Sequence, residues 1–208
     1  MRIFVKRAEM AVVLTPDEWA GAASTCGAWD GHVFRATRVG GALVLGHLGL
    51  HDDVLAVPIN VSSRHPDAGV RLLSNFAATP FDLHGKPYAS VEGFWQSLRA
   101  PSPGDRARIA LLSGPAAKHA GAAYPAPSHV RLVDREVAWG SPEHWDLMRE
   151  ACRAKFSQVE AASAALLATA PRPLQHRTRV DSRSIPGRVM ASIWMGLRTE
   201  LSLTGRAR

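Results

Sequence analysis

The stretch LLSNFAATPFDLHGKPYASVEGFWQ, residues 72–96, carries the densest local pattern in the chain. Residues 84–86 read as a turn between two short strands, and Ser90 then precedes a helical repeat of apolar residues. Glu92 falls in the first turn of that helix, where unpaired N–H groups and the helix dipole favour an anion. The sequence therefore predicts two strands and a helix that starts at Ser90 and carries the Glu92 carboxylate.

The predicted helix has two stripes. The apolar stripe, at the spacing of a buried face, consists of Val91, Phe94, Trp95 and Leu98. The adjacent polar stripe consists of Glu92, Gln96 and Arg99. A carboxylate at this boundary is partly desolvated while it faces a cleft, which shifts its pKa into a range useful for an acid or base.

Composition favours one sizeable globular domain, alone or with an extension. The chain has 208 residues, is 46% hydrophobic and carries a formal charge of +7. Only four of its 25 basic residues are lysines, and arginine is the better bidentate partner for phosphate and carboxylate. The balance favours a nucleotide-like partner or a nucleic acid, DNA or RNA; solvated surface arginines are the alternative.

Cysteine use and the N-terminal residues indicate a cytoplasmic protein with no membrane contact. Cys26 and Cys152 lie far apart, as core thiols of a reducing compartment do. Residues 1–14 include Lys6, Arg7 and Glu9, so they contain no apolar run of signal-peptide or membrane-span length.

No cofactor is predicted, and no metal. His47, His51 and Asp52 have metal-capable side chains, but no further ligand at a typical spacing completes the set. Gly40 and Gly41 form a hairpin turn between residues 32–39 and 42–46, so they are not a phosphate loop.

The fold class predicted is α+β. Residues 1–56 are read as a β-rich extension packed on the main domain, and residues 57–208 as a mainly helical domain with a small sheet. Strands are expected at 3–5, 11–14 and 54–57, a brief helix at 15–19, and the hairpin described above. Later helices are expected at 105–112, at 115–120, from Pro142, at 161–168, and from about Pro186.

Several spaced motifs resemble the NADAR (YbiA-like) family. They are Ser-Asn-Phe at 74–76, Pro-Phe at 80–81, Gly85, Ser-Val-Glu at 90–92 and Phe-Trp-Gln at 94–96. Trp139, the segment from Met148 to Lys155-Phe156, and Leu-Leu-Ala-Thr-Ala at 166–170 continue the match, which spans roughly residues 57–202. The agreement of several motifs in one order makes the resemblance specific.

The resemblance implies an N-glycosidase fold that handles ribosylated bases. Members cleave the N-glycosidic bond of early riboflavin-pathway intermediates, or remove ADP-ribose from guanine in nucleic acid. By position, the functional set is Glu92, Trp139 and Asp181. The chain departs from the family in two places: Asp181 is followed by 182–184 and the last helix, not by a glycine-rich loop, and residues 59–64 contain no lysine.

Our hypothesis assigns a role to each member of this set. Glu92 is the general base or stabilises the oxocarbenium-like state; Asp181 binds a ribose hydroxyl or acts as the partner carboxylate; Trp139 stacks on the leaving base. Each residue also has a structural alternative: a helix-capping charge for Glu92, a salt bridge to neighbouring arginines for Asp181, and a core position for Trp139.

Substrate-binding residues are predicted in two groups. Around the helix they are Asn75, Phe76, Gln96 and Arg99. Before the last helix, residues 176–184 form a basic, hydroxyl-rich cluster that we interpret as a phosphate site, with Arg177, Arg179 and Arg183 as its cations. A solvated basic loop is the alternative.

The function expected is metal-independent N-glycosidase activity that removes ADP-ribose from guanine. Cleavage of riboflavin-pathway ribosylaminopyrimidines is the alternative reaction. Two other classes stay open: a non-catalytic module that binds ADP-ribose or modified nucleic acid, and a structural relative whose N-terminal extension fills the cleft. Sequence leaves the oligomeric state open.

Overall fold

The computed structural model describes the backbone of five N-terminal strands and residues 57–133, 135–179, 182 and 184–205. Its contacts divide the chain into two compact units. Unit 1 comprises residues 1–60, 169–178 and 187–208, and unit 2 comprises residues 61–168 and 179–186. The predicted boundary after residue 56 stays a prediction, and these contacts group the C-terminal helix with the N-terminal strands.

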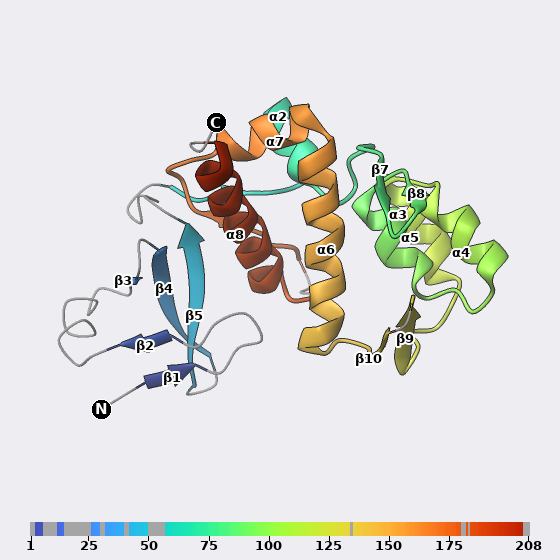
Figure 1. The fold of residues 1–208 in the computed structure, drawn as a ribbon, viewed down its shortest axis with the longest axis horizontal. Helices are drawn as coiled ribbons and strands as arrows, with labels where there is room; N and C mark the ends of the chain where they lie inside the picture. Colours follow the sequence, from blue (N-terminus) through green and yellow to red (C-terminus); the bar gives the residue numbers. More distant parts are fainter. Residues whose placement is uncertain are drawn as a thin grey trace. The chain divides into compact units, whose positions relative to one another are not determined.

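Unit 1 contains small antiparallel sheets (Figure 1). One pairs β1 (Ile3–Val5) with β2 (Val12–Leu14). The other has the order β3-β4-β5, from β3 (Cys26–Trp29), β4 (His32–Val39) and β5 (Ala42–Gly49). Val39 lies opposite Ala42, so the predicted turn at 40–41 connects the hairpin strands.

Distant segments of the chain complete unit 1. The strand β6 (Ile59–Asn60) pairs in parallel with β11 (Leu174–Gln175). The long helix α8 (Gly187–Gly205) lies against both β5 and β11. The side chain of Arg198, on α8, donates a hydrogen bond to the carbonyl oxygen of Arg172, just before β11.

Unit 2 is mainly helical (Figure 1). Its strands form two hairpins, β7 (Phe81–Leu83) with β8 (Lys86–Tyr88), and β9 (His129–Leu132) with β10 (Arg135–Ala138). Its helices are α2 (Ala68–Leu73), α3 (Val91–Ser97), α4 (Pro103–Ala110), α5 (Gly114–Ala122), α6 (Pro142–Gln158) and α7 (Glu160–Leu167).

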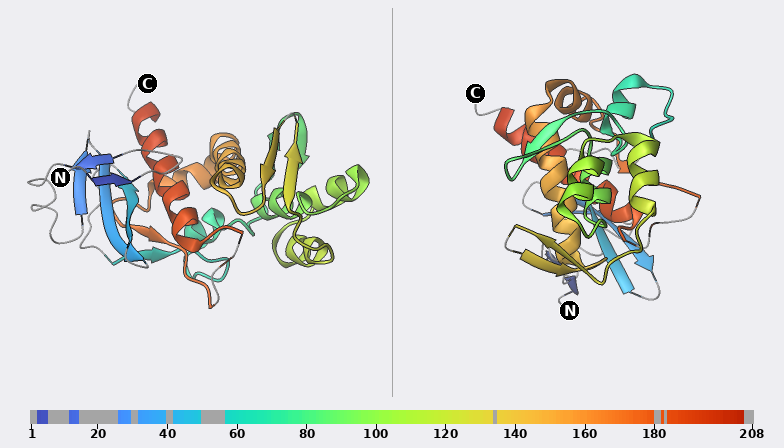
Figure 2. Two further views of the ribbon diagram at one scale, coloured as in Figure 1. Left: turned by 90° about the horizontal axis from the view of Figure 1, so that it is seen from below. Right: turned by 90° about the vertical axis from the view of Figure 1, so that its right-hand side faces the viewer.

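The short helix α3 lies at the centre of unit 2. It packs against α4, α5 and α6, and Figure 2 shows α3 among the neighbouring helices α4 and α5. All seven of its residues are buried. A helix of this length has little stability alone, so these contacts hold it together.

The structure confirms the α+β class and the strand–turn–strand–helix unit, with α3 capped by Ser90 as predicted. The hairpin at 32–46 and the later helices are also present, with bounds shifted by a few residues. Sequence reasoning missed α2 and the β9–β10 hairpin. The strand predicted at 54–57 and the helix predicted at 15–19 lie outside the described residues, except Val57, which is irregular.

Among the described residues, no helix combines the length and apolar character needed to cross a bilayer.

Gly93 permits the close approach of α3 to the end of α4. A Cβ at this position would collide with the Leu112 carbonyl oxygen and would lie 2.8 Å from that of Ala110. We predict that Gly93→Ala destabilises the protein by about 1–3 kcal/mol, because backbone atoms must shift to admit the methyl group.

Gly104 in α4 is the matched control, since a Cβ there meets nothing within 4 Å. Gly104→Ala should leave stability unchanged or raise it by up to about 1 kcal/mol. Urea denaturation of the two variants and the wild-type protein measures the difference. Equal effects of the two substitutions would contradict the packing role of Gly93.

Candidate functional site

The start of α3 is fixed by contacts with two loops. The Ser90 hydroxyl accepts a hydrogen bond from the Gly93 N–H at 2.8 Å and donates one to the Leu112 carbonyl at 3.0 Å. The Glu92 N–H donates to the Asn75 carbonyl at 2.9 Å. The first turn of α3 is thereby connected to the loop at residues 74–76 and to the end of α4.

The Glu92 side chain is deeper than the sequence pattern predicts. We expected partial exposure at the edge of the apolar stripe, but the residue is only 7% exposed. Its Oε1 accepts a hydrogen bond from the Gln96 Nε2 at 2.9 Å. Burial raises the pKa of the carboxyl group above its ordinary value, while this hydrogen bond and the charge of Lys118 lower it in part.

Gln96 orients Glu92 from one turn further along α3. Its amide packs so closely on α5 that a Cβ at Gly121 would collide with its Oε1 atom. This Oε1 is buried and receives no hydrogen bond from the described residues. The close packing leaves the amide little freedom to turn, and it keeps the Nε2 atom directed at the carboxylate.

Lys118 and Phe76 extend the site beyond Glu92. Lys118 is exposed on α5, and its Nζ lies 5.8 Å from the centre of the Phe76 ring. The ammonium group is also close enough to lower the pKa of Glu92. Phe76 in turn lines an open cavity of about 410 Å³ together with residues of α2 and the loop that follows it.

Side chains of α6 contact the loop at 74–76. Lys155 is 1% exposed, and its Nζ donates to the Ser74 carbonyl at 3.0 Å. Burial lowers the pKa of this ammonium group to about 8. The Asn75 Nδ2 lies 3.7 Å from the Met148 sulfur, so this predicted substrate-binding residue also contacts the protein itself.

Three aromatic side chains form a cluster next to this loop and helix. The His144 ring stacks on Trp95 with its centre 4.1 Å from that of Trp95, and 4.4 Å from that of Trp139. The His144 Nδ1 accepts a hydrogen bond from the Gly140 N–H at 3.0 Å. His144 thus sits between the helix that carries Glu92 and the predicted base-stacking residue Trp139.

Arg99 connects the polar stripe of α3 to the same cluster. Its Nε donates to the Tyr124 carbonyl at 3.1 Å, and its guanidinium carbon lies 6.0 Å from the centre of the Trp139 ring. Arg99 lies two residues after Ser97, the last residue of α3, so the predicted polar stripe extends past the end of the helix. The stripe therefore runs from the buried carboxylate to the half-buried Trp139.

Comparison with known proteins places this geometry in a family. A family model described as bacteriophage protein GP30.3 matches residues 68–184, more than half of the chain. The chain is 34% identical over 129 residues to N-glycosidase YbiA of Escherichia coli (strain K12), covering 60% of this chain and 72% of that protein. The chain belongs to the YbiA family.

Two further comparisons agree. N-glycosidase YbiA of Shigella boydii serotype 4 (strain Sb227) is 34% identical over 124 residues, with the same coverage. The solution structure of the E. coli YbiA protein matches with a TM-score of 0.56 and 27% identity, over 76% of this chain and 92% of that one. The YbiA-like resemblance inferred from the motifs is thereby confirmed.

Asp181 and the three arginines of the predicted phosphate site are described less completely by the structure. Asp181 and Arg183 lie outside the described residues. Arg177 belongs to unit 1, where its backbone pairs with the Asn60 side chain through hydrogen bonds of 2.7 and 3.3 Å. Arg179 is exposed in unit 2. The roles of these four residues stay predictions.

The segment that follows Asp181 is anchored within unit 2. The Trp145 indole Nε1 donates to the Ser184 carbonyl at 2.8 Å, and the Ser182 hydroxyl accepts from the Ile185 N–H at 3.2 Å. Trp145 is adjacent in sequence to His144. The first turn of α6 therefore holds both the aromatic cluster and this segment.

Sequence reasoning missed three residues of this candidate site. Lys118 and His144 contact Phe76 and Trp95 from other helices, so no local spacing identifies them. Lys155 was noted only as part of a family motif. A lysine in an otherwise apolar helical stripe was the available signal, because a cation in such a position needs a buried partner.

Among the described residues, no cluster of three or more His, Cys, Asp or Glu is placed to hold a metal ion. Of the metal-capable residues in the sequence, His51 and Asp52 lie outside the described residues, and only the backbone of His47 is described.

Because His144 is buried, we predict that the free energy of unfolding depends on pH. Its ring is fully buried, and burial lowers the pKa of the imidazole from 6.5 to about 4. The unfolded chain binds a proton at a higher pH than the folded one. This contribution to stability is therefore complete above pH 6.5 and is lost as the pH falls towards 4.

We expect the wild-type protein to lose about 2 kcal/mol more stability between pH 7 and 4.5 than His144→Phe, which keeps an aromatic ring but does not titrate. Urea denaturation of the two proteins across this range gives the difference. Parallel pH profiles would show that His144 is not the titrating group.

Proposed function

We propose that this protein is an N-glycosidase that hydrolyses the bond between a ribose and its base, with ADP-ribosyl-guanine in nucleic acid as the substrate. The observation that carries this proposal is the buried Glu92 carboxylate with its raised pKa, near the Lys118 ammonium group. Membership of the family of N-glycosidase YbiA supports the reaction class.

Glu92 is the residue assigned to the chemical step. Cleavage of an N-glycosidic bond passes through an oxocarbenium-like state, which an adjacent anion stabilises. A buried carboxylate has greater electrostatic influence on such a cation than an exposed one, because water screens it less. The same carboxylate accepts a proton from the attacking water, since its raised pKa makes it a stronger base.

Trp139 and Asp181 complete the proposed set. Trp139 is backed by His144 and Trp95, so its ring is held in place to stack on the leaving base. Asp181 would bind a ribose hydroxyl or act as the second carboxylate. The hydrogen bond from Trp145 to Ser184, three residues after Asp181, supports this role because it holds the segment on the helix that bears His144.

Charge supports the choice of substrate. The formal charge of +7 comes from a chain in which arginine far outnumbers lysine, and Arg177, Arg179 and Arg183 are proposed to bind the diphosphate of ADP-ribose. Asn75, Phe76, Gln96 and Arg99 are proposed to contact the substrate around α3. We also propose a cytoplasmic location, which the free, buried thiol of Cys152 supports.

One assay separates the candidate reactions. The purified protein is incubated with an ADP-ribosylated guanine oligonucleotide and, separately, with a riboflavin-pathway ribosylaminopyrimidine phosphate, and products are resolved by chromatography. We expect release of ADP-ribose from the oligonucleotide. Release of base from the pyrimidine alone would assign the other reaction, and tight binding without turnover would indicate a binding module.

Glu92→Gln tests the chemical role directly. We expect kcat to fall by about 10²- to 10⁴-fold, because the amide neither accepts a proton nor carries a charge. Stability should stay constant or rise, because a buried charge is removed.

Glu160→Gln is the matched control, since Glu160 is also a first-turn glutamate, at the start of α7. It should retain full activity. Unchanged turnover in Glu92→Gln, with the fold intact by circular dichroism, would remove Glu92 from the mechanism.

Lys118 gives a test based on pH. An ionised Glu92 is needed, so kcat/KM should rise with pH through the raised pKa of this group. Lys118 lowers that pKa, and Lys118→Met should therefore move the rising limb to higher pH. Lys118→Arg, which keeps the charge, should leave the limb near its wild-type position.

Arg64→Met serves as the control, because it removes a different exposed cation of the same unit. Its pH profile should match that of the wild-type protein. An equal shift in Arg64→Met would mean that the net charge of the protein, and not the position of Lys118, determines the pH at which kcat/KM rises.

A further inference from the structure

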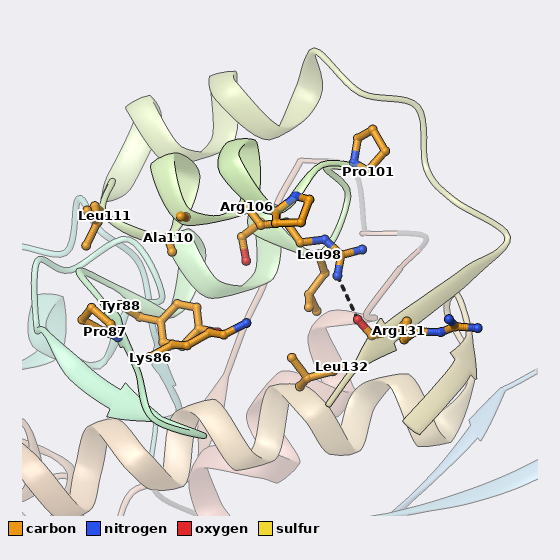
Figure 3. A pocket seen from close by; sticks show the side chains of 13 residues that line it. Lys86, Pro87, Tyr88, Leu98, Pro101, Arg106, Ala110, Leu111, Arg131 and Leu132 are labelled. Carbon is orange, nitrogen blue, oxygen red and sulfur yellow. Dashed lines mark hydrogen bonds between the residues drawn. The ribbon is translucent and has the colours of Figure 1, made fainter. Parts of the chain in front are cut away.

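A second cavity lies on another side of α3. It has a volume of about 580 Å³, within the usual range for sites that hold small molecules. Its walls come from β8, the last residues of α3, α4 and β9, all in unit 2 (Figure 3). The apolar part of the wall includes Leu98, Pro101, Ala110, Leu111 and Leu132.

Helical geometry separates this cavity from the Glu92 site. Residues of an α-helix advance by about 100° each, so Leu98 and Ser97 point roughly 120–140° away from Glu92. Both Leu98 and Ser97 line the cavity, whereas Glu92 and Gln96 do not. The helix α3 is therefore a wall between two different sites.

Polar groups in the cavity are positively charged or hydrogen-bond donors. Three lining side chains are cations, from Lys86, Arg106 and Arg131, and none of the lining residues is acidic. Arg131 is paired with Glu136 at 2.8 Å, and Arg106 donates to the carbonyls of Ala100 and Arg131. Lys86 has no carboxylate partner among the described residues, so its charge is available to a ligand.

Tyr88 supplies the second polar group. It is 5% exposed, and its ring packs on Phe81 and Phe94 with centres 5.6 and 5.2 Å away. No described residue forms a hydrogen bond with its hydroxyl group. Lys86 and Tyr88 are two apart on β8, so both side chains lie on one face of that strand, and Figure 3 shows them together in the cavity.

We propose that this cavity binds a small amphipathic anion, with an apolar body and one acidic group. The apolar body lies against Leu98, Leu132 and the α4 wall. The acidic group accepts a hydrogen bond from the Tyr88 hydroxyl and forms an ion pair with Lys86. None of the lining residues is a carboxylate, a histidine or a cysteine, and Glu92 does not line the cavity, so we infer a binding site that is independent of the glycosidase reaction.

Charge complementarity decides against other occupants. A neutral apolar ligand would leave the Tyr88 hydroxyl without a partner, which costs free energy in a buried place. A cation would be repelled by Lys86 and Arg106, which have no carboxylate partner among the described residues. A small organic acid satisfies both the donor and the charge.

The test uses 1-anilinonaphthalene-8-sulfonate, an aromatic monoanion whose fluorescence rises on binding, with the full-length protein. Lys86→Glu should weaken binding at least about fivefold, because an attraction becomes a repulsion. Ala107→Trp, which fills the cavity from the exposed side of α4, should also weaken it. Arg64→Glu makes the same charge change outside the cavity and should bind as the wild-type protein does.

A neutral probe with nearly the same body, N-phenyl-1-naphthylamine, isolates the role of charge. Its affinity should fall in Ala107→Trp and stay constant in Lys86→Glu. Glu92→Gln should bind the anionic probe normally even if it loses glycosidase activity, so the two proposals are tested apart. Anionic binding that is insensitive to Lys86→Glu or to Ala107→Trp would overturn this inference.

Discussion

The contact between the first turn of α3 and its surroundings is the constraint on which the rest of unit 2 depends. Ser90 caps the helix and binds the Leu112 carbonyl, the Glu92 N–H binds the Asn75 carbonyl, and Gly93 has no side chain to separate the backbones. A seven-residue helix would not persist alone. These contacts fix the position of the helix, and with it the position of the carboxylate proposed to be catalytic.

Burial of Glu92 follows from that placement, and the chemistry proposed for the site depends on it. Desolvation raises the pKa of the carboxyl group, and the Gln96 amide and the Lys118 charge limit the rise. The Gln96 hydrogen bond and the Lys118 charge also partly compensate the cost of burying this carboxylate. Lys155 of α6 stabilises the loop that contacts Glu92, because its ammonium group donates a hydrogen bond to the Ser74 carbonyl, next to Asn75.

The aromatic cluster connects this carboxylate to the surface proposed to receive the base. Trp95 extends from α3, His144 from α6, and Trp139 from the segment between β10 and α6. A neutral, buried imidazole suits a position between two indole rings, since a charged one would need solvation. The same first turn of α6 holds Ser184, which joins the region after Asp181 to this cluster.

Sequence alone determined the local features of this protein. The Ser90 cap, the two strands and the first-turn position of Glu92 follow from residue spacing within a few turns of chain. The resemblance to the YbiA-like family follows from several motifs that occur in one order along the chain. Only the tertiary structure decided how deeply Glu92 is buried. It also decided that Lys118, His144 and Lys155 lie around the site. Those residues come from other helices, and the distances between helices depend on packing, which no local pattern encodes.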